Sequence, residues 1–201
     1  MTVAAAGQRA ADRAVFPVAG LPFGRRSSKG RERWYLLRVP EGREAATCAE
    51  LKRLVPDDLL KDAFALRKER WFKRAGKWSL VPIDMYRGYA FAVSPDAAGL
   101  SRALSRLTLP VSLVGTESRS WAPLADEVAS WYASVTDEGH VIRSSTAVIV
   151  DGVLHVTEGP LVGQEARISK VDRHRRRCMV RVADGDGGFA EQAAIDVPFK
   201  S

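Results

Sequence analysis

The strongest constraint on the fold is a two-residue turn near the C-terminal end of the chain. Asp151-Gly152 separates two apolar runs, Ala147–Val150 and Val153–Val156. Both residue types adopt positive φ readily, so this pair between apolar runs is a strong short-range signal for a β-hairpin. Further short apolar segments follow at 166–171, 178–183 and 189–197. About five short strands within roughly 50 residues predict a small five-stranded β-barrel at 147–201.

Residues 34–135 show a different pattern, in which strand-like and helix-like segments alternate. Apolar residues at helical spacing predict helices over 41–55 and 121–133, and Ser94-Pro95-Asp96 is a typical helix start. Strands are expected at 34–39, 62–74, 77–83, 89–93 and 111–114. The strands at 62–74 and 77–83 lie on either side of Ala75-Gly76 and are expected to form a hairpin. The order strand, helix, three strands, helix, strand is typical of an antiparallel sheet with helices on one face. We therefore expect an α+β fold.

Two segments lie outside these expected domains. Residues 1–33 are expected to form a disordered basic tail without core residues, because Ala, Gly, Arg and Ser dominate there. This tail is either simply solvated or a basic arm that touches nucleic acid, and its deletion should leave the rest folded. Residues 136–146 are mostly polar and predict a linker between a domain at 34–135 and a domain at 147–201.

Composition narrows the class of protein. The formal net charge of +7 favours polyanionic partners, most often nucleic acid. No apolar run approaches the roughly 20 residues that a membrane span needs, and the N-terminus has no apolar core typical of a signal peptide. We therefore expect a cytoplasmic protein without a membrane partner. Cys48 and Cys178 have no CxxC spacing and are expected to be reduced structural thiols.

No motif in the chain indicates catalysis. The sequence contains no GxSxG, GxxxxGK[ST] or HExxH pattern and no paired-cysteine metal site. Asp184 and Asp186 could hold a cation, but aspartates in a Gly-rich hairpin more often form turns. We therefore expect no enzyme, no catalytic residues, no cofactor and no metal site.

A dense basic cluster indicates a nucleic-acid site. Seven Lys and Arg side chains fall between residues 167 and 181, where Asp172 is the single acid. Arginine binds phosphate through two parallel hydrogen bonds and stacks on unpaired bases. A merely solvated turn is the alternative interpretation. The candidate RNA-binding residues are Lys170, Arg173, His174, Arg175, Arg176 and Arg177.

Aromatic residues gather at the start of a predicted central strand, within Met85–Phe91. Tyr89 and Phe91 are two residues apart, so their side chains point to the same face of the sheet, and Tyr86 is close by. Core packing is one interpretation. If the helices cover the other face, these rings form an exposed apolar patch, which usually marks a partner site.

Taken in order, these segments resemble the NusG family of bacterial transcription factors. Arg33–Leu37 resembles the family's first strand, and Met85–Phe91 its Phe-Pro-Gly-Tyr-Val-type segment. Val156–Gly163 with Lys170–Asp172 is similar to its KOW motif. The resemblance implies an NGN-like polymerase-binding domain at 34–135 and a KOW domain at 147–201.

Gly159–Leu161 followed by Lys170–Arg176 is most similar to the LoaP branch of the family. That resemblance implies a transcription antitermination or processive elongation factor. Its N-terminal domain would bind RNA polymerase, and its KOW domain would bind a structured RNA leader, such as a hairpin, with upstream DNA as a further partner. The resemblance also implies polymerase contacts by Tyr86, Tyr89 and Phe91. We expect the protein to act as a monomer.

Two departures from the family's pattern bear on the alternatives. Arg87 stands where the family usually has proline, and Asp184–Phe189 replaces the common Phe-Gly-Arg turn. In housekeeping members that turn region contacts a ribosomal protein or the termination factor Rho, so the altered turn argues against this role. A ribosome- or RNA-binding protein that uses the KOW barrel alone is the other alternative. The expected N-terminal domain argues against it.

Overall fold

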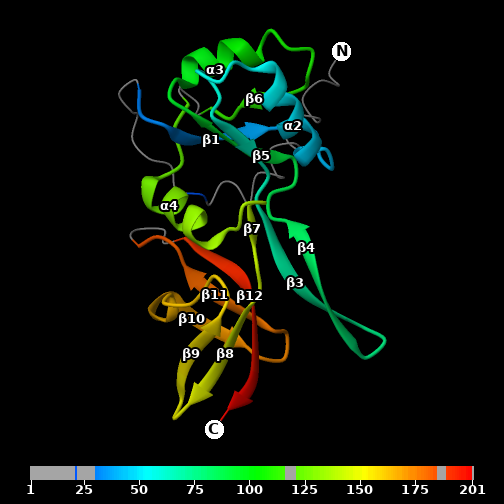
Figure 1. Cartoon of the computed structure of the whole chain (residues 1–201), viewed down its shortest axis with the longest axis vertical. Coiled ribbons are helices and arrows are strands. Elements are labelled where there is room, and N and C mark those ends of the chain that lie inside the picture. The colour runs from blue at the N-terminus through cyan, green and yellow to red at the C-terminus, as the bar shows by residue number, and fades with distance from the viewer. Residues whose placement is uncertain (1–20, 22–29, 116–120, 185–188, 201) are drawn as a thin grey trace, which may run out of the picture.

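The computed structural model describes residue 21 and residues 30–115, 121–184 and 189–200. It has an α+β fold with three sheets (Figure 1). The α+β class expected from the sequence is therefore confirmed. The turn expected at 184–188 and most of the tail 1–33 lie outside the described residues.

Four antiparallel strands form the upper sheet in Figure 1, in the order β2-β5-β1-β6. The strands are β1 (Arg33–Arg38), β2 (Asp62–Phe64), β5 (Tyr89–Ser94) and β6 (Ser112–Leu113). The register of β1 and β5 places Leu36 opposite Phe91 and Leu37 opposite Ala90. Successive side chains point to opposite faces of a sheet, so Leu36 and Phe91 share one face, and Leu37 and Ala90 share the other.

Two helices cover one face of this sheet, as expected. α2 (Glu44–Leu54) and α3 (Ala97–Leu104) bury Leu51 and Leu100 in the same core cluster as Leu37. α3 begins two residues later than the Ser94-Pro95-Asp96 start predicted, because Asp96 and not Ser94 is the N-cap. The Asp96 side chain accepts a hydrogen bond from the Gly99 N–H at 3.0 Å.

The third helix does not lie on the same face as the other two, so the expectation that all helices cover one face is wrong. α4 (Asp126–Val135) packs on the opposite face, where Val128 and Tyr132 join Leu36 and Phe91 in a second buried cluster. The apolar stripe of this helix was predicted, but a stripe does not specify which side of the sheet it covers. Figure 1 shows α4 between the upper sheet and the C-terminal strands.

A long hairpin projects from the body of the molecule (Figure 1). It consists of β3 (Arg67–Arg74) and β4 (Lys77–Asp84), joined at Ala75 (φ 49°) and Gly76 (φ 80°). Two successive positive φ angles are typical of a tight two-residue turn. The predicted hairpin is confirmed, but its first arm is divided into β2 and β3. Four strands therefore lie between α2 and α3, where the sequence predicted three.

The segment expected to be a linker contributes to a sheet. Val141 and Ile142 form β7, which pairs in parallel with β3 and is buried. Thr136 also forms a bridge with Ile142. The prediction of a polar linker at 136–146 is therefore wrong for these residues, because the two apolar side chains extend the hairpin sheet instead of lying in solvent.

The C-terminal residues form one curved five-stranded sheet in the order β10-β11-β12-β8-β9. Its strands are β8 (Ser145–Val150), β9 (Val153–Glu158), β10 (Ile168–Asp172), β11 (Arg177–Arg181) and β12 (Ala190–Lys200). The β8–β9 turn has Asp151 at φ 51° and Gly152 at φ 78°, which confirms the predicted hairpin. Five strands were predicted and are present, but among the described residues β9 and β10 do not pair to close a barrel.

The two expected domains share one core. Phe91 of the upper sheet, Tyr132 of α4 and Ile195 of the C-terminal sheet belong to the same buried cluster. Leu21 also belongs to it and is only 3% exposed. The expectation that residues 1–33 contain no core residue is therefore wrong at Leu21.

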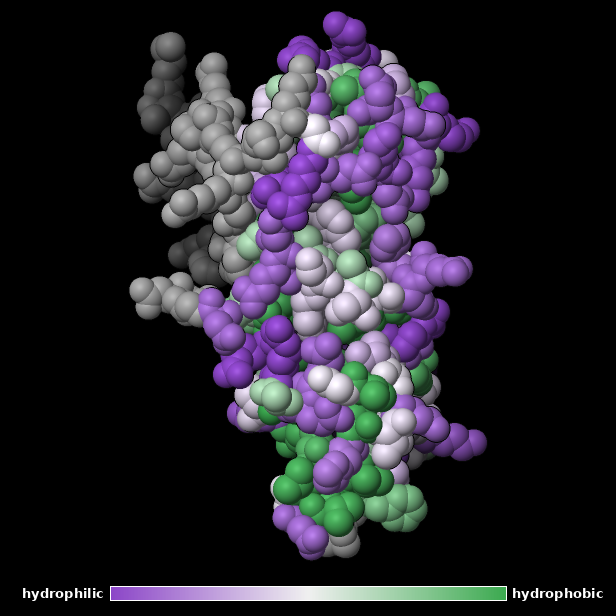
Figure 2. Space-filling view, turned by 60° about the vertical axis from the view of Figure 1, so that its left-hand side comes forward, coloured by the Kyte–Doolittle hydropathy of each residue, from purple (hydrophilic) through white to green (hydrophobic). Residues whose placement is uncertain are grey.

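The end of the molecule formed by the C-terminal strands carries exposed apolar side chains. Figure 2 shows hydrophobic residues gathered at this lower end. Val150 and Val153 beside the β8–β9 turn are exposed, and Phe199 of β12 is 72% exposed. Within the described part of the chain, none of the helices has the length and apolar character needed to cross a membrane.

Candidate nucleic-acid interface

The predicted basic cluster lies at the turn between β10 and β11. The Asp172 carboxylate accepts a hydrogen bond from the Arg175 N–H at 3.1 Å, and the Arg176 N–H donates to the Arg173 carbonyl at 3.3 Å. Arg176 adopts a positive φ of 49°. These contacts define a tight turn that holds four successive cationic or imidazole side chains, from Arg173 to Arg176, at one end of the sheet.

The six predicted RNA-binding residues are not equivalent in the structure. Lys170 and His174 are exposed and, among the described residues, make no side-chain hydrogen bond or ion pair. Arg173 is exposed, and its Nε donates to the Val197 carbonyl at 3.4 Å. Arg175 is 71% exposed and only 3.9 Å from Asp172, and Arg177 lies 3.3 Å from the same carboxylate. The turn therefore retains exposed positive charge.

Arg176 is the member of the cluster that stacks on the N-terminal hairpin. Its guanidinium lies over the rings of Trp71 at 4.7 Å and Trp78 at 5.0 Å, and it forms a 3.2 Å ion pair with Asp196. Its stacking partners come from the β3–β4 hairpin, about a hundred residues earlier in the chain. Arg176 therefore attaches the basic turn to the hairpin.

Two hollows flank the turn. The first, which we call the hairpin cleft, has a volume of about 240 Å³ and lies between the β3–β4 hairpin, the basic turn and β12. The second is a wider groove of about 670 Å³. Lys170, Arg173 and His174 line the groove, Arg175 and Arg177 line the cleft, and Arg176 lines both. The structure therefore divides the predicted RNA-binding residues between two neighbouring concave surfaces.

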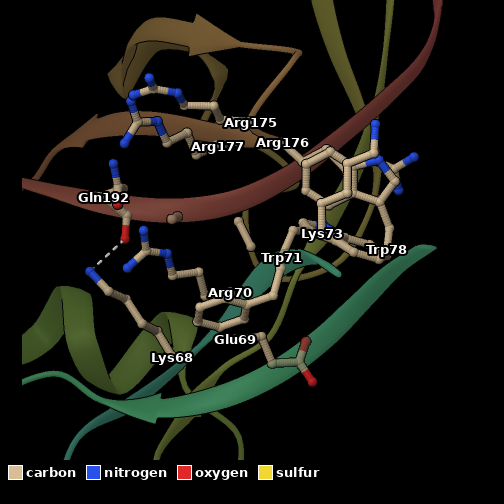
Figure 3. A pocket seen from close by; sticks show the side chains of 13 residues that line it. Lys68, Glu69, Arg70, Trp71, Lys73, Trp78, Arg175, Arg176, Arg177 and Gln192 are labelled. Carbon is tan, nitrogen blue, oxygen red and sulfur yellow. Dashed lines mark hydrogen bonds between the residues drawn. The ribbon is translucent and has the colours of Figure 1, made fainter. Parts of the chain in front are cut away.

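The hairpin supplies site residues that were not predicted. Figure 3 shows Lys68 and Arg70 pointing toward Gln192 of β12, with Arg176 beside the ring of Trp78. Arg70 lies over the Phe72 ring at 5.2 Å, and Lys73 lies over the Trp78 ring at 5.7 Å. The signal was present in the sequence, because Arg67–Arg74 interleaves basic and aromatic residues along one strand. Such interleaving is typical of nucleic-acid surfaces.

The hairpin cleft is strongly positive. Its cationic lining residues are Lys68, Arg70, Lys73, Arg175, Arg176 and Arg177, against the single carboxylate of Glu69. That carboxylate already accepts hydrogen bonds from Arg143 and from the Ser144 N–H. Arg70 and Lys73 form no ion pair with any described residue, so their charge is not neutralised within the protein.

The three predicted polymerase-contact residues lie at the shared core. Phe91 is 0% exposed, Tyr86 is 5% exposed and Tyr89 is half-buried. Of the two interpretations of these rings, core packing is therefore the one observed for Tyr86 and Phe91, and the exposed patch is wrong for them. The physical reason is that α4 and the C-terminal sheet pack on the face that the sequence interpretation left open to solvent.

A polar network ties this aromatic face to the C-terminal sheet. The Tyr86 and Tyr132 hydroxyls are 2.6 Å apart, and Glu191 Oε2 accepts hydrogen bonds from both at 3.2 Å. Glu191 Oε1 forms a 2.6 Å ion pair with Lys68 Nζ. Burial and the nearby Glu191 charge raise the pKa of both tyrosines, so the hydroxyls stay protonated and can donate.

The two cysteines are buried free thiols, as expected. Burial raises the pKa of Cys48 to about 11 and that of Cys178 to about 12, so neither is a reactive thiolate at neutral pH. Among the described residues, no group of three or more His, Cys, Asp or Glu side chains is placed to hold a metal ion.

The arrangement is suited to binding a polyanion that also carries flat apolar groups. Exposed guanidinium and ammonium groups can bind phosphates, and the neighbouring aromatic rings can stack on bases. Comparison with protein-family models and with curated proteins finds no match for this chain.

Proposed function

We propose that this chain is a NusG-type transcription antitermination factor of the cytoplasm that binds RNA at its basic turn and RNA polymerase through its N-terminal region. In this proposal, residues 34–135 act as an NGN-like domain and residues 147–201 as a KOW domain. The proposal is supported by the resemblance of the sequence motifs. It is also supported by the α+β architecture, in which an antiparallel sheet precedes a five-stranded C-terminal sheet.

One observation carries the nucleic-acid part of the proposal. Two basic segments that are far apart in sequence, Lys68–Lys73 and Arg175–Arg177, converge on the hairpin cleft. Lys68, Arg176 and Arg177 have acidic partners, but Arg70 and Lys73 have no ion-pair partner among the described residues. Like charges repel, so gathering these cations on one surface costs folding free energy. A phosphate backbone removes that repulsion and releases counterions on binding, which favours a nucleic-acid ligand.

Polymerase binding through the aromatic residues requires a rearrangement. Tyr86 and Phe91 lie beneath α4 and the C-terminal sheet, and Glu191 holds the Tyr86 and Tyr132 hydroxyls. In the proposed mechanism these elements move away before polymerase contacts the face that they cover. The free protein would then be a mixture of a closed and an open form, and polymerase would bind only the open form.

The proposal is tested by polymerase retention and terminator read-through. The full chain is immobilised and incubated with purified bacterial RNA polymerase, and with ribosomes in a parallel experiment. Read-through is then measured on a template that carries a structured leader, and on one with a scrambled leader. We expect polymerase retention, no ribosome retention, and read-through that depends on the leader. Ribosome retention without polymerase retention would contradict the proposal.

A pair of variants separates the RNA role from the polymerase role. Arg173→Ala with Arg175→Ala should weaken leader RNA binding, lower the salt dependence of that binding, and leave polymerase retention unchanged. Arg102→Ala with Arg106→Ala removes the same charge from exposed positions of α3 and the turn after it, and serves as the matched control. Equal RNA affinity for both double variants would show that the basic turn is merely solvated.

A second candidate function rests on the apolar end of the C-terminal sheet. Val153 and Phe199 are exposed there, and exposed apolar patches usually mark protein contacts. A housekeeping NusG-type factor, which couples polymerase to the ribosome or to Rho, would use such a surface. Ribosome or Rho retention that is lost in Phe199→Ser and kept in the Arg173, Arg175 double variant would favour this candidate.

A further inference from the structure

The hairpin cleft has the size of a site for one small flat group. Its volume is about 240 Å³. Sites for drug-sized ligands and cofactors usually measure about 300–1,000 Å³, so a dinucleotide or a comparable cofactor would not fit. A single nucleobase, inserted while its sugar and phosphate remain outside, is a better match to a cleft of this size.

Three aromatic residues line the cleft. They are Trp71, Phe72 and Trp78, and we call these three residues the aromatic wall. A planar group already lies on this wall, because the Arg176 guanidinium stacks over both indole rings. Phe72 is 39% exposed, so part of the wall is open to solvent. Every base has a π-face and stacks on such rings, largely independently of its sequence.

The rim of the cleft carries cations that the protein leaves available. Arg70 and Lys73 have no ion-pair partner among the described residues, and Arg175 is 71% exposed with a carboxylate only at 3.9 Å. We call these three residues the open cations. They come from both sides of the cleft, the hairpin and the β10–β11 turn, so a strand lying across the cleft would place phosphates near each side.

We propose that the hairpin cleft binds one unpaired nucleotide of a single-stranded nucleic acid, with its base against the aromatic wall and its flanking phosphates on the open cations. The inference rests on the proposed function and deepens it, because it assigns part of the recognition in the closed form to the N-terminal hairpin. The basic turn alone is not sufficient, and an RNA with an unpaired base is preferred over a fully paired stem.

The first test uses two simultaneous measurements on the intact chain. A short single-stranded oligoribonucleotide is titrated while its fluorescence anisotropy reports total binding and tryptophan fluorescence reports occupancy of the cleft. An abasic oligomer of the same length and charge is the control. We expect the base-containing strand to quench tryptophan fluorescence and to bind about tenfold more tightly, which corresponds to one stacked base. Equal affinity and equal quenching for both strands would overturn the proposal.

The second test uses substitutions in the cleft. Trp78→Leu should reduce both quenching and affinity, whereas Trp78→Phe should retain the affinity, because it keeps a ring for stacking. Arg70→Gln with Lys73→Gln should reduce the magnitude of the slope of log affinity against log salt by about 1.4 for a single strand. Arg102→Gln with Arg106→Gln is the charge-matched control. Both hairpin cations are exposed or partly exposed strand positions, so this pair is informative even if Trp78→Leu does not fold.

The outcomes separate this inference from the proposed function. In one outcome, leader RNA binds without tryptophan quenching and loses affinity only when Arg173 and Arg175 are replaced. This outcome would overturn nucleotide binding in the hairpin cleft and leave the proposed RNA-binding function intact. If oligonucleotides quench tryptophan fluorescence but the chain retains no polymerase, nucleotide binding in the cleft is supported and the proposed role in transcription is contradicted. The affinity for a DNA strand of the same sequence is measured to decide whether RNA or DNA is the ligand of the cleft. Tighter RNA binding assigns the cleft to the transcript, and tighter DNA binding assigns it to an exposed DNA strand.

Discussion

The Arg176 guanidinium lies 4.7 Å from the centre of the Trp71 ring and joins the C-terminal turn to the N-terminal hairpin. The same group lies 5.0 Å from the Trp78 ring and forms an ion pair with Asp196. Cation–π contacts stabilise by about 0.5–1 kcal/mol when exposed and by about 2 kcal/mol when desolvated. This residue, predicted to bind RNA, therefore also stabilises the contact between two parts of the chain.

We expect Arg176→Asn to destabilise the protein by about 1–2 kcal/mol, because both ring contacts and the Asp196 ion pair are lost. Asparagine tolerates the positive φ at this position, so the effect belongs to the side chain and not to the turn. Urea denaturation measures the change. Arg175→Asn, at an exposed position, should have little effect, and equal stability of the two variants would contradict the structural role of Arg176.

We expect Glu191→Ala to lower the free energy of unfolding by about 2–3 kcal/mol, since two tyrosine hydroxyls and Lys68 lose a charged partner together. The same change should increase polymerase retention, because the contact that holds the C-terminal sheet over the aromatic face becomes weaker. Denaturation and the retention assay measure the two effects on the same preparation.

Glu158→Ala is the matched control for this variant. Glu158 is an exposed acid of β9 with no ion pair among the described residues, so its removal changes the net charge by the same amount. A Glu191→Ala protein that is less stable but retains no more polymerase than the Glu158→Ala protein would argue against the open form as the binding form.

The Glu44 carboxylate links α2 to the turn before β5, because its Oε1 accepts a hydrogen bond from the Gly88 N–H at 2.7 Å. Burial alone would raise the pKa of Glu44, but backbone hydrogen bonds, including that from Gly88, and the charge of Arg87 lower it below its ordinary value of 4.5. A lowered folded-state pKa means that this stability is present above pH 4.5 and is lost as the pH falls through the folded-state pKa.

Glu44→Gln should therefore be less stable than the parent at pH 7. The loss in free energy of unfolding should not exceed about 1.5–3 kcal/mol, because the glutamine amide oxygen still accepts a weaker hydrogen bond. The difference should shrink as the pH falls below 4.5. Urea denaturation across this range measures it, with Glu50→Gln on the same helix as the control. A difference that stays constant with pH would show that the Glu44 charge is not responsible.

Leu21→Ala should lower the free energy of unfolding by about 2–5 kcal/mol, as expected for truncation of a buried leucine. Leu21 is 3% exposed in the shared core, so deletion of residues 1–33 should also lower the melting temperature, contrary to the expectation from composition. Leu54→Ala, at an exposed position of α2, should have a small effect. Equal melting temperatures for the two leucine variants would place Leu21 outside the core.

Local patterns were sufficient to predict most of the elements. The Asp151-Gly152 and Ala75-Gly76 turns were predicted because glycine and its neighbour determine where the backbone can reverse. Apolar spacing likewise predicted the stripe of α4, and a short apolar run predicted β1. These features depend on residues that are close in sequence, so one chain without relatives contains enough information to find them.

The sequence by itself therefore determined the two hairpin turns, most of the strands and the basic character of residues 167–181. The tertiary structure decided which elements cover which residues. Whether Tyr86 and Phe91 face solvent depends on where α4 and Glu191 lie, and whether Arg176 is free depends on Trp71, about a hundred residues away. Such long-range contacts arise from the packing of whole elements, which minimises exposed apolar area over the entire chain, and no local pattern encodes them.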